Sequence, residues 1–336
     1  MAAYKTLKGQ SIIQVAEDPT NPLEGEIWYN TTLGVLKGYQ QVAAAWASGG
    51  AASNTSARNR ALAGTQTAAF MSGGYIGSNN QTKDTEEYNG SSWTSGGNLV
   101  AQGNNPPGGT YSGVACGTQT AGLFAGGSSQ GGVDYYFNTS YEYDGSSWGS
   151  PATFTSPGLR SMGLFGVQTA AVSAGGTRPG QPYVRVYEYD GSSWTAATSL
   201  PTGSSDGGRS GTLTAGLIFG GDSPSITAAT NEYDGTNWTS GGTMVYAQTD
   251  LNSSGAGTQT AALSAKGYNG TATIATAQLY DGSSWSATAT AATAVSSLQS
   301  GAGTSSAGLS AGGSPAAVEE FTGGTEVVTA STLTTS

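Results

Sequence analysis

The chain has 336 residues, of which 54 are glycine and only 10% are charged, and its formal net charge is −10. This composition excludes long amphipathic helices, and the shortage of cations argues against a nucleic-acid partner. The absence of histidine and the single Cys116 exclude a Ser-His-Asp triad, a Cys-His pair, a histidine-ligated metal and an internal disulfide. We therefore expect no metal and no cofactor, and any catalysis would have to use carboxylates, Tyr, Lys or Arg.

The N-terminal segment, residues 1–47, differs from the rest of the chain. Residues 1–9 lack the apolar core of a secretory signal, and no apolar run is long enough to cross a membrane, so we expect neither export by a signal peptide nor membrane insertion. Alternating residues in 26–30, then Thr-Leu-Gly, then residues 35–39 predict a β-hairpin.

A repeated motif follows this segment. It reads Gly-Thr-Gln-Thr-Ala-Ala-Phe-Met-Ser-Gly-Gly at residues 64–74 and recurs at intervals of 45 to 53 residues, beginning at Gly117, Gly166, Gly211, Gly257 and Gly303. Its short apolar stretches, residues 68–71, 121–125, 170–174 and 216–219, suit buried strands, because they are too short for helices.

A second motif follows each of the first five copies, as in Glu142-Tyr-Asp-Gly-Ser-Ser-Trp148. Asp-Gly or Asn-Gly predicts a tight hairpin of type I′, in which both residues take a positive φ. The carboxylates Asp144, Asp190, Asp234 and Asp281 are therefore interpreted as turn residues, not as calcium ligands. Each unit has room for about four strands, which is the size of a propeller blade.

The apolar strand ending in Gly-Gly, followed by Tyr and then Trp, resembles the kelch repeat of β-propellers. This resemblance implies an all-β, kelch-like β-propeller over residues 48–336. We expect six four-stranded blades, with seven as the alternative. The repeated aromatic residues would fill the gaps between blades, and they are Trp46, Trp93, Trp148, Trp194, Trp238 and Trp285.

The sixth copy of the second motif has no Trp, whereas Trp46 precedes Gly64 by the same interval as Trp148 precedes Gly166. We therefore expect the strand around Trp46 to be the outer strand of a blade formed near the C terminus. The alternative is that residues 325–330 form that outer strand and residues 26–47 remain a separate hairpin or part of a seventh blade.

The run Pro-x-x-Gly-x-x-Trp-Tyr-Asn-Thr-Thr at residues 22–32, followed by a Leu-Lys strand, is similar to a small module of tailed-phage, especially marine phage, fibre-like virion proteins. The resemblance implies a virion protein made in the host cytoplasm and assembled as a homo-oligomer. Residues 1–47 would attach it to other virion proteins.

Residues that interrupt the repeat are the better candidates for ligand binding, because exposed Tyr and Asn on rigid loops suit sugar recognition. The candidates are Asn104, Asn105, Tyr111, Asp134, Tyr135, Tyr136, Phe137, Tyr183 and Arg185. The same loops could instead pack against a neighbouring subunit.

These features lead us to expect a non-enzymatic structural protein of the phage tail, in a fibre or appendage, that binds a host-surface glycan or receptor. One alternative is a capsid decoration or tail-assembly subunit without a receptor role. The other is a carboxylate-based glycan-degrading enzyme, with a pair drawn from Asp134, Asp206, Asp222 and Asp250. Arg58, Arg60, Arg160 and Arg209 recur before the first motif and are interpreted as structural.

Overall fold

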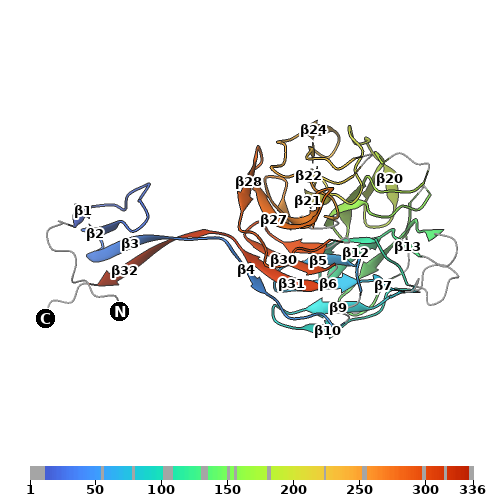
Figure 1. The fold of residues 1–336 in the computed structure, drawn as a ribbon, viewed down its shortest axis with the longest axis horizontal. Coiled ribbons are helices and arrows are strands. Elements are labelled where there is room, and N and C mark those ends of the chain that lie inside the picture. The colour runs from blue at the N-terminus through green and yellow to red at the C-terminus, as the bar shows by residue number, and fades with distance from the viewer. Residues whose placement is uncertain are drawn as a thin grey trace. The chain divides into compact units, whose positions relative to one another are not determined.

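Strands and turns make up the chain in the computed structural model (Figure 1). The structure describes residues 12–53, 57–77, 80–100, 109–129, 135–149, 152–154, 157–179, 183–222, 225–251, 256–296, 300–313 and 316–332. Within these ranges no helix is long and apolar enough to cross a membrane. The chain divides into two units, one formed by residues 45–322 and the other by residues up to 44 together with those from 323 onward.

The larger unit contains six four-stranded antiparallel sheets among its described residues. We number them by chain order. The first three contain β5 (Ala61–Gly64), β6 (Ala69–Ser72), β9 (Thr85–Tyr88) and β10 (Trp93–Ser95); β11 (Val114–Thr118), β12 (Ala121–Ala125), β15 (Thr139–Tyr143) and β16 (Ala152–Thr153); and β17 (Gly163–Val167), β18 (Ala170–Ala174), β19 (Val186–Tyr189) and β20 (Trp194–Ala196).

The fourth and fifth sheets follow the same order, and the sixth takes its last strand from the N-terminal part of the chain. They contain β21 (Gly208–Thr212), β22 (Ala215–Phe219), β23 (Thr230–Tyr233) and β24 (Trp238–Ser240); β25 (Ala256–Thr258), β26 (Ala261–Tyr268), β27 (Thr273–Tyr280) and β28 (Trp285–Thr288); and β29 (Ser300–Gly303), β30 (Ala307–Gly312), β31 (Ala317–Thr322) and β4 (Ala45–Ser48). Two small ribbons, β7 (Tyr75–Gly77) with β8 (Asn80–Gln81) and β13 (Ser128–Ser129) with β14 (Tyr135–Tyr136), extend from the first two sheets.

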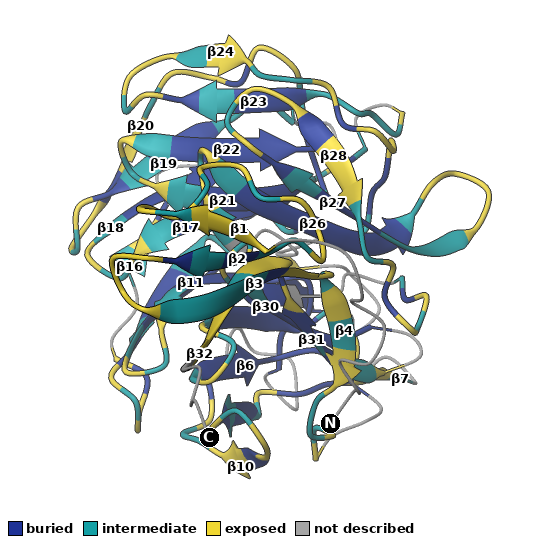
Figure 2. Ribbon diagram, turned by 90° about the vertical axis from the view of Figure 1, so that its left-hand side faces the viewer, coloured by how far each residue is buried: buried dark blue, intermediate teal, exposed yellow. Residues whose placement is uncertain are grey.

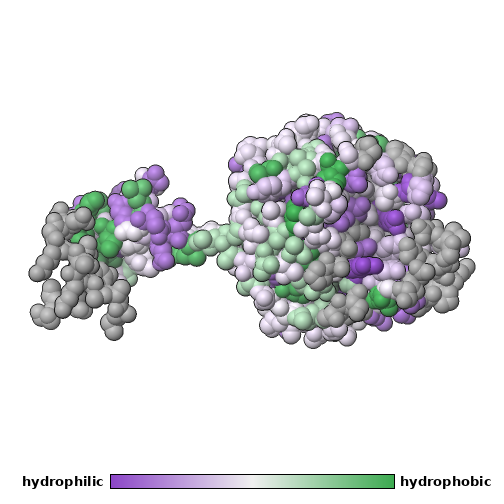
Figure 3. Space-filling view, in the orientation of Figure 1, coloured by the Kyte–Doolittle hydropathy of each residue, from purple (hydrophilic) through white to green (hydrophobic). Residues whose placement is uncertain are grey.

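The predicted apolar stretches form the second strands of their sheets, and these strands are buried (Figure 2). Among the strands of these sheets, the last ones are the more exposed, as in β10 and β24. The surface of this unit is mostly pale in the hydropathy view of Figure 3, as expected for a chain rich in Gly, Ser and Thr. The apolar side chains are therefore mostly buried in the contacts between sheets.

The first strands of successive sheets contact one another in the order β5, β11, β17, β21, β25 and β29, and β29 contacts β5. The space between them is a narrow channel of about 130 Å³, lined mostly by Gly, Ala and Ser, with Arg209 also in its wall. This arrangement of radiating sheets is a β-propeller-like fold.

A hydrogen bond from Tyr to Glu joins each of five sheets to the sheet before it. The Tyr of the second motif donates its hydroxyl to the Glu beside the preceding sheet's aromatic residue. The five pairs are Tyr88–Glu320, Tyr143–Glu87, Tyr189–Glu142, Tyr233–Glu188 and Tyr280–Glu232, at 2.5 to 3.0 Å. The sixth pair is missing, because Leu279 replaces the Glu and Phe321 replaces the Tyr. Neither side chain can form the hydrogen bond.

The Gln of the first motif makes a second link between sheets. Gln119 donates to the carbonyls of Ala69 and Tyr88, and Gln168 donates to the carbonyls of Gly122 and Tyr143. Gln66 and Gln259 bond the equivalent carbonyls of their own preceding sheets. Conservation of this Gln among four copies therefore reflects a contact between sheets.

The prediction for Trp46 is confirmed. Strand β4 pairs with β31, with Trp46 opposite Phe321, and the indole N–H of Trp46 donates to the carbonyl of Ala289 in the fifth sheet's connection. The alternative outer strand, residues 325–330, instead lies in β32 (Thr325–Thr332) and pairs with β3 (Val35–Val42).

The Asp-Gly turns are correct in position but not in type. Tyr143 pairs with Trp148 across a four-residue loop, in which Gly145 has a φ of 90° while Asp144 has no positive φ. The Asp144 carboxylate accepts hydrogen bonds from the backbone N–H groups of Ser146 and Ser147 at 2.8 and 2.7 Å. Both donors lie within the four-residue loop, which is longer than a two-residue type I′ turn. These bonds hold the pKa of the Asp144 carboxyl well below its usual range.

The smaller unit is a four-stranded sheet in the order β1 (Ile13–Val15), β2 (Ile27–Asn30), β3, β32. Strand β2 pairs with β3 as the predicted hairpin. Asp18 bonds Lys37, Asn30 and the buried Trp28, and the Lys37 ammonium is the main cause that lowers the pKa of Asp18 to about 2. The unit thus has its own polar centre.

Trp194→Ala should lower the free energy of unfolding by about 3–5 kcal/mol, because a fully buried indole is lost and a cavity remains. Trp194 is 2% exposed, stacks on Phe154 with ring centroids 4.3 Å apart, and donates to Ser140. Trp238 at the equivalent position is only half-buried, so Trp238→Ala is the control and should cost clearly less. Denaturant unfolding of both variants measures this, and equal losses would contradict it.

The double variant Leu279→Glu, Phe321→Tyr should install the sixth Tyr–Glu bond. Leu279→Glu alone adds a carboxylate without its hydroxyl donor and should destabilise the protein, whereas the pair should recover about 1–2 kcal/mol of coupling energy. A double-mutant cycle of unfolding free energies measures the coupling. A coupling of zero would show that the two positions do not face each other as the other five pairs do.

Candidate functional site

Five equivalent residues at one end of the larger unit have left-handed backbone conformations. Each precedes the first strand of its sheet, by two residues in four cases and by six at Asp250, with a φ between 54° and 59°. They are Asn59, Ser112, Ser161, Asp206 and Asp250. Non-glycine residues in this conformation each cost about 1 kcal/mol or more, and such strain gathers at functional sites.

Backbone hydrogen bonds connect these residues from sheet to sheet. Ser112 N–H donates to Asn59, Ser161 N–H to Ser112 and Asp206 N–H to Ser161, at 2.9 to 3.0 Å. Leu251 N–H continues the series by donating to the carbonyl of Asp206 at 2.9 Å. The series fixes the backbone around the end of the channel, so the side chains here project from rigid positions.

A cavity of about 510 Å³ opens at this end, and we call it the mouth pocket. The first three sheets supply its cations and rings, while the fourth and fifth sheets supply its two carboxylates. Its lining is Arg58, Asn59, Tyr75, Tyr111, Ser112, Arg160, Ser161, Thr177, Asp206 and Asp250. The volume is within the range of small-molecule binding pockets.

Asp206 is an acid of the pocket with a perturbed pKa. Asp206 is half-buried and lines the cavity, and desolvation raises its pKa to about 6. The hydrogen bond from Ser161 and the charge of Arg160 oppose the shift, while the charges of Asp250 and Asp222 add to it. Asp206 therefore carries a proton for part of the time near neutral pH, as a general acid requires.

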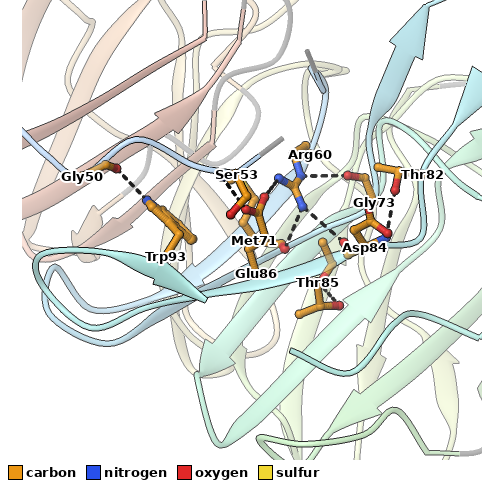
Figure 4. A network of polar contacts seen from close by, with 11 residues as sticks. Gly50, Ser53, Arg60, Met71, Gly73, Thr82, Asp84, Thr85, Glu86 and Trp93 are labelled. Carbon is orange, nitrogen blue, oxygen red and sulfur yellow. Dashed lines mark hydrogen bonds and ion pairs between the residues drawn. The ribbon is translucent and has the colours of Figure 1, made fainter. Parts of the chain in front are cut away.

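The four arginines interpreted as structural fall into two groups. Arg60 is buried, ion-paired with Glu86 and bonded to the carbonyls of Gly73, Met71 and Asp84 (Figure 4). Arg209 is also buried, and it donates to the carbonyls of Leu164 and Ala115 across the channel. Both support the scaffold.

Arg58 and Arg160 instead line the mouth pocket. The Arg58 guanidinium lies over the Tyr75 ring at 5.0 Å, and Arg160 lies over Tyr111 at 5.6 Å while donating to its hydroxyl at 2.7 Å. The structural interpretation is therefore incomplete for these two, because their charged ends face a cavity.

The structure places some of the predicted ligand-binding residues at this pocket. Tyr111 lines it, and Tyr136 contacts Arg160 and Arg178 beside it. Tyr135 is exposed, and Phe137, Tyr183 and Arg185 are half-buried. Asn104, Asn105 and Asp134 lie outside the described residues.

The sequence placed Asp206 and Asp250 among four carboxylates, with Asp134 and Asp222, from which a catalytic pair could be drawn, but it did not single out these two. A signal for them exists in the repeat itself. Both precede the first strand of their sheets, 44 residues apart, where the other sheets carry Asn59, Ser112 and Ser161. Within the described residues, no group of three or more His, Cys, Asp or Glu residues could hold a metal ion.

The chain matches no protein-family model and no curated protein. Its structure is similar to the solved structure of YjhT, with a TM-score of 0.63 and 12% sequence identity, over 82% of this chain and 98% of that chain. At this identity the likeness shows the fold alone, and it supports the β-propeller-like architecture.

The expectation that the protein is not an enzyme is corrected. The finding against it is the fold, which is similar to that of YjhT. Sequence distance hid the convergence of Asp206 and Asp250, which lie on different sheets and meet at the same end of the channel.

Asp206→Asn should stabilise the protein at pH 7.5 by about 2 kcal/mol. Because the pKa of Asp206 is raised in the folded state, ionising it costs stability progressively as pH rises from about 4 to about 6, and the full cost persists above that range. The advantage of the amide should therefore vanish at pH 4. Thermal melting at both pH values measures it, and an equal effect at both would contradict the shift.

Proposed function

We propose that the protein is a carboxylate-based enzyme that acts on glycans, built on a closed, six-bladed, kelch-type propeller with its active site in the mouth pocket. The observation that carries the proposal is the meeting of Asp206, whose pKa is raised to about 6, with Asp250 and Arg160 in one cavity. The cyclic contacts of the six first strands and the pairing of β4 with β31 support the six-bladed ring.

The two carboxylates would take different roles. Half-buried and partly protonated, Asp206 would donate its proton to the oxygen leaving the anomeric carbon. Asp250 on the neighbouring sheet would, as a carboxylate, stabilise the positive charge that develops at that carbon. Tyr75 and Tyr111 would position the sugar rings by stacking.

We propose a phage particle as the setting, with a host-surface glycan as the substrate. The resemblance of residues 22–32 to a virion module supports this location, in the tail or as a subunit on the capsid. The smaller unit exposes Leu23 and Leu33, at 73% and 60%, which suits attachment to another virion protein or to a second copy.

The test is the release of reducing ends from a panel of bacterial surface polysaccharides. Asp206→Asn and Asp250→Asn should each lower kcat/KM at least 100-fold, because a proton donor or a charge-stabilising group is lost. Asp234→Asn is the matched control, since the first copy carries Asn89 at that turn position. Activity of Asp206→Asn equal to that of the unmodified protein would overturn the assignment.

The pH profile tests the role of Asp206 independently. A general acid must be protonated, so kcat/KM should fall tenfold per pH unit above about pH 6. A profile that is flat from pH 5 to pH 8 would contradict a proton-donating Asp206.

A further inference from the structure

We propose that a continuous row of arginine and tyrosine side chains binds an anionic polysaccharide chain and leads it into the mouth pocket. The row, in contact order, is Arg58, Tyr75, Tyr111, Arg160, Tyr136 and Arg178. This inference rests on the proposed glycan-acting function and names the class of glycan.

The row is continuous because every neighbour is in contact with the next. Tyr75 and Tyr111 meet edge to face with centroids 5.8 Å apart. Arg160 lies over two rings, Tyr111 at 5.6 Å and Tyr136 at 5.4 Å, and Arg178 lies over the other end at 5.6 Å from Tyr136. Tyr136 and Arg178 are not among the residues lining the pocket, so the row extends beyond it.

Arg160 donates one N–H to the Tyr111 hydroxyl and Arg178 donates one to the Gly158 carbonyl, and a guanidinium has further N–H groups that can bond a ligand. An arginine that covers an aromatic ring uses its face, while its N–H groups point sideways, where they can bond a carboxylate or sulfate in a bidentate manner. The stacked rings also hold three like charges in fixed places, so less conformational entropy is lost on binding. The tyrosines between them offer ring faces to sugars.

The distribution of charge favours an anionic partner. The chain has 11 Lys and Arg residues against 21 Asp and Glu residues, yet three arginines gather in this row. Screening limits surface charge effects to about 8–10 Å at physiological salt, so the row and not the net charge decides local binding. The acids of the pocket come from the fourth and fifth sheets, whereas Arg58, Arg160 and Arg178 come from the first and third.

The length of the row points to a polymer, because six side chains in sequence exceed what one sugar ring can contact. The adjoining carboxylates Asp206 and Asp250 favour a polysaccharide over a nucleic acid, since closely spaced phosphates would approach them. An acidic polysaccharide can instead place a neutral glycosidic oxygen at the acids while its anionic groups lie on the arginines.

The experiment measures binding by Asp206→Asn protein, in which turnover is blocked, to four probes: polygalacturonate, dextran sulfate, neutral dextran and single-stranded DNA of similar length. Polygalacturonate or dextran sulfate should bind at least tenfold more tightly than dextran, and the pair distinguishes carboxylate from sulfate. Galacturonic acid monomer should bind at least tenfold more weakly than its polymer.

The exposed Arg58 is the first variant, because its loss leaves the fold intact. Arg58→Gln and Tyr136→Leu should each weaken polymer binding about three- to tenfold, whereas Lys83→Gln, which removes an exposed cation outside the row, should not change it. Equal binding of dextran and the two polyanions, tighter binding of DNA, or equal effects of Arg58→Gln and Lys83→Gln would overturn the inference. Cleavage of a neutral glycan without any preference for polyanions would overturn it while leaving the proposed function in place.

Discussion

The hydrogen bond between each Tyr and the Glu of the preceding sheet is the interaction on which the larger unit depends. Its donor is largely buried, and burial raises the pKa of the Tyr143 hydroxyl far above its usual value, so the bond keeps its proton at all working pH values. A buried hydroxyl or carboxylate without a partner would cost more than the bond contributes. The Tyr of each sheet therefore needs the Glu of the preceding sheet as its hydrogen-bond partner. Each sheet meets this need for the next one around the axis. Where the hydroxyl is lost, at Phe321, the matching Glu is also replaced, by Leu279.

Links of this kind allow the mouth to hold strained residues. The left-handed Asp206 and Asp250 are costly locally, yet the backbone bonds from Asp206 to Ser161 and from Leu251 to Asp206 leave the chain no relaxed alternative. The same rigidity keeps the Asp206 carboxyl in a poorly solvated place, which raises its pKa. Stability supplied by the outer parts of the sheets thus holds an unfavourable acid at the mouth pocket.

The sequence was sufficient to predict the features that recur in every repeat. The apolar stretches that end in glycine predicted the second strands. The interval from Trp46 to Gly64 placed β4 in the last sheet, because the sixth copy of the second motif has no Trp of its own. It could not predict that Asp144 would accept two backbone N–H groups in a four-residue loop, since Asp-Gly also suits a shorter turn. Nor could it bring Asp206 and Asp250 together, because their proximity follows from the angle between sheets and not from any local pattern.

The sheet that joins the two ends of the larger unit carries an interaction that the regular copies lack. Glu319, buried in β31, pairs with Lys266, which replaces a glycine in β26 and keeps a positive φ of 64°. Lys266 also lies over the Trp46 ring at 5.5 Å, so one cation contacts both β31 and the N-terminal strand β4. Desolvation lowers the pKa of Lys266 and offsets much of the pair's attraction, so its contribution to stability is small. Its contribution to specificity is larger, because only the correct pairing of β4 with β31 provides both partners for this buried charge.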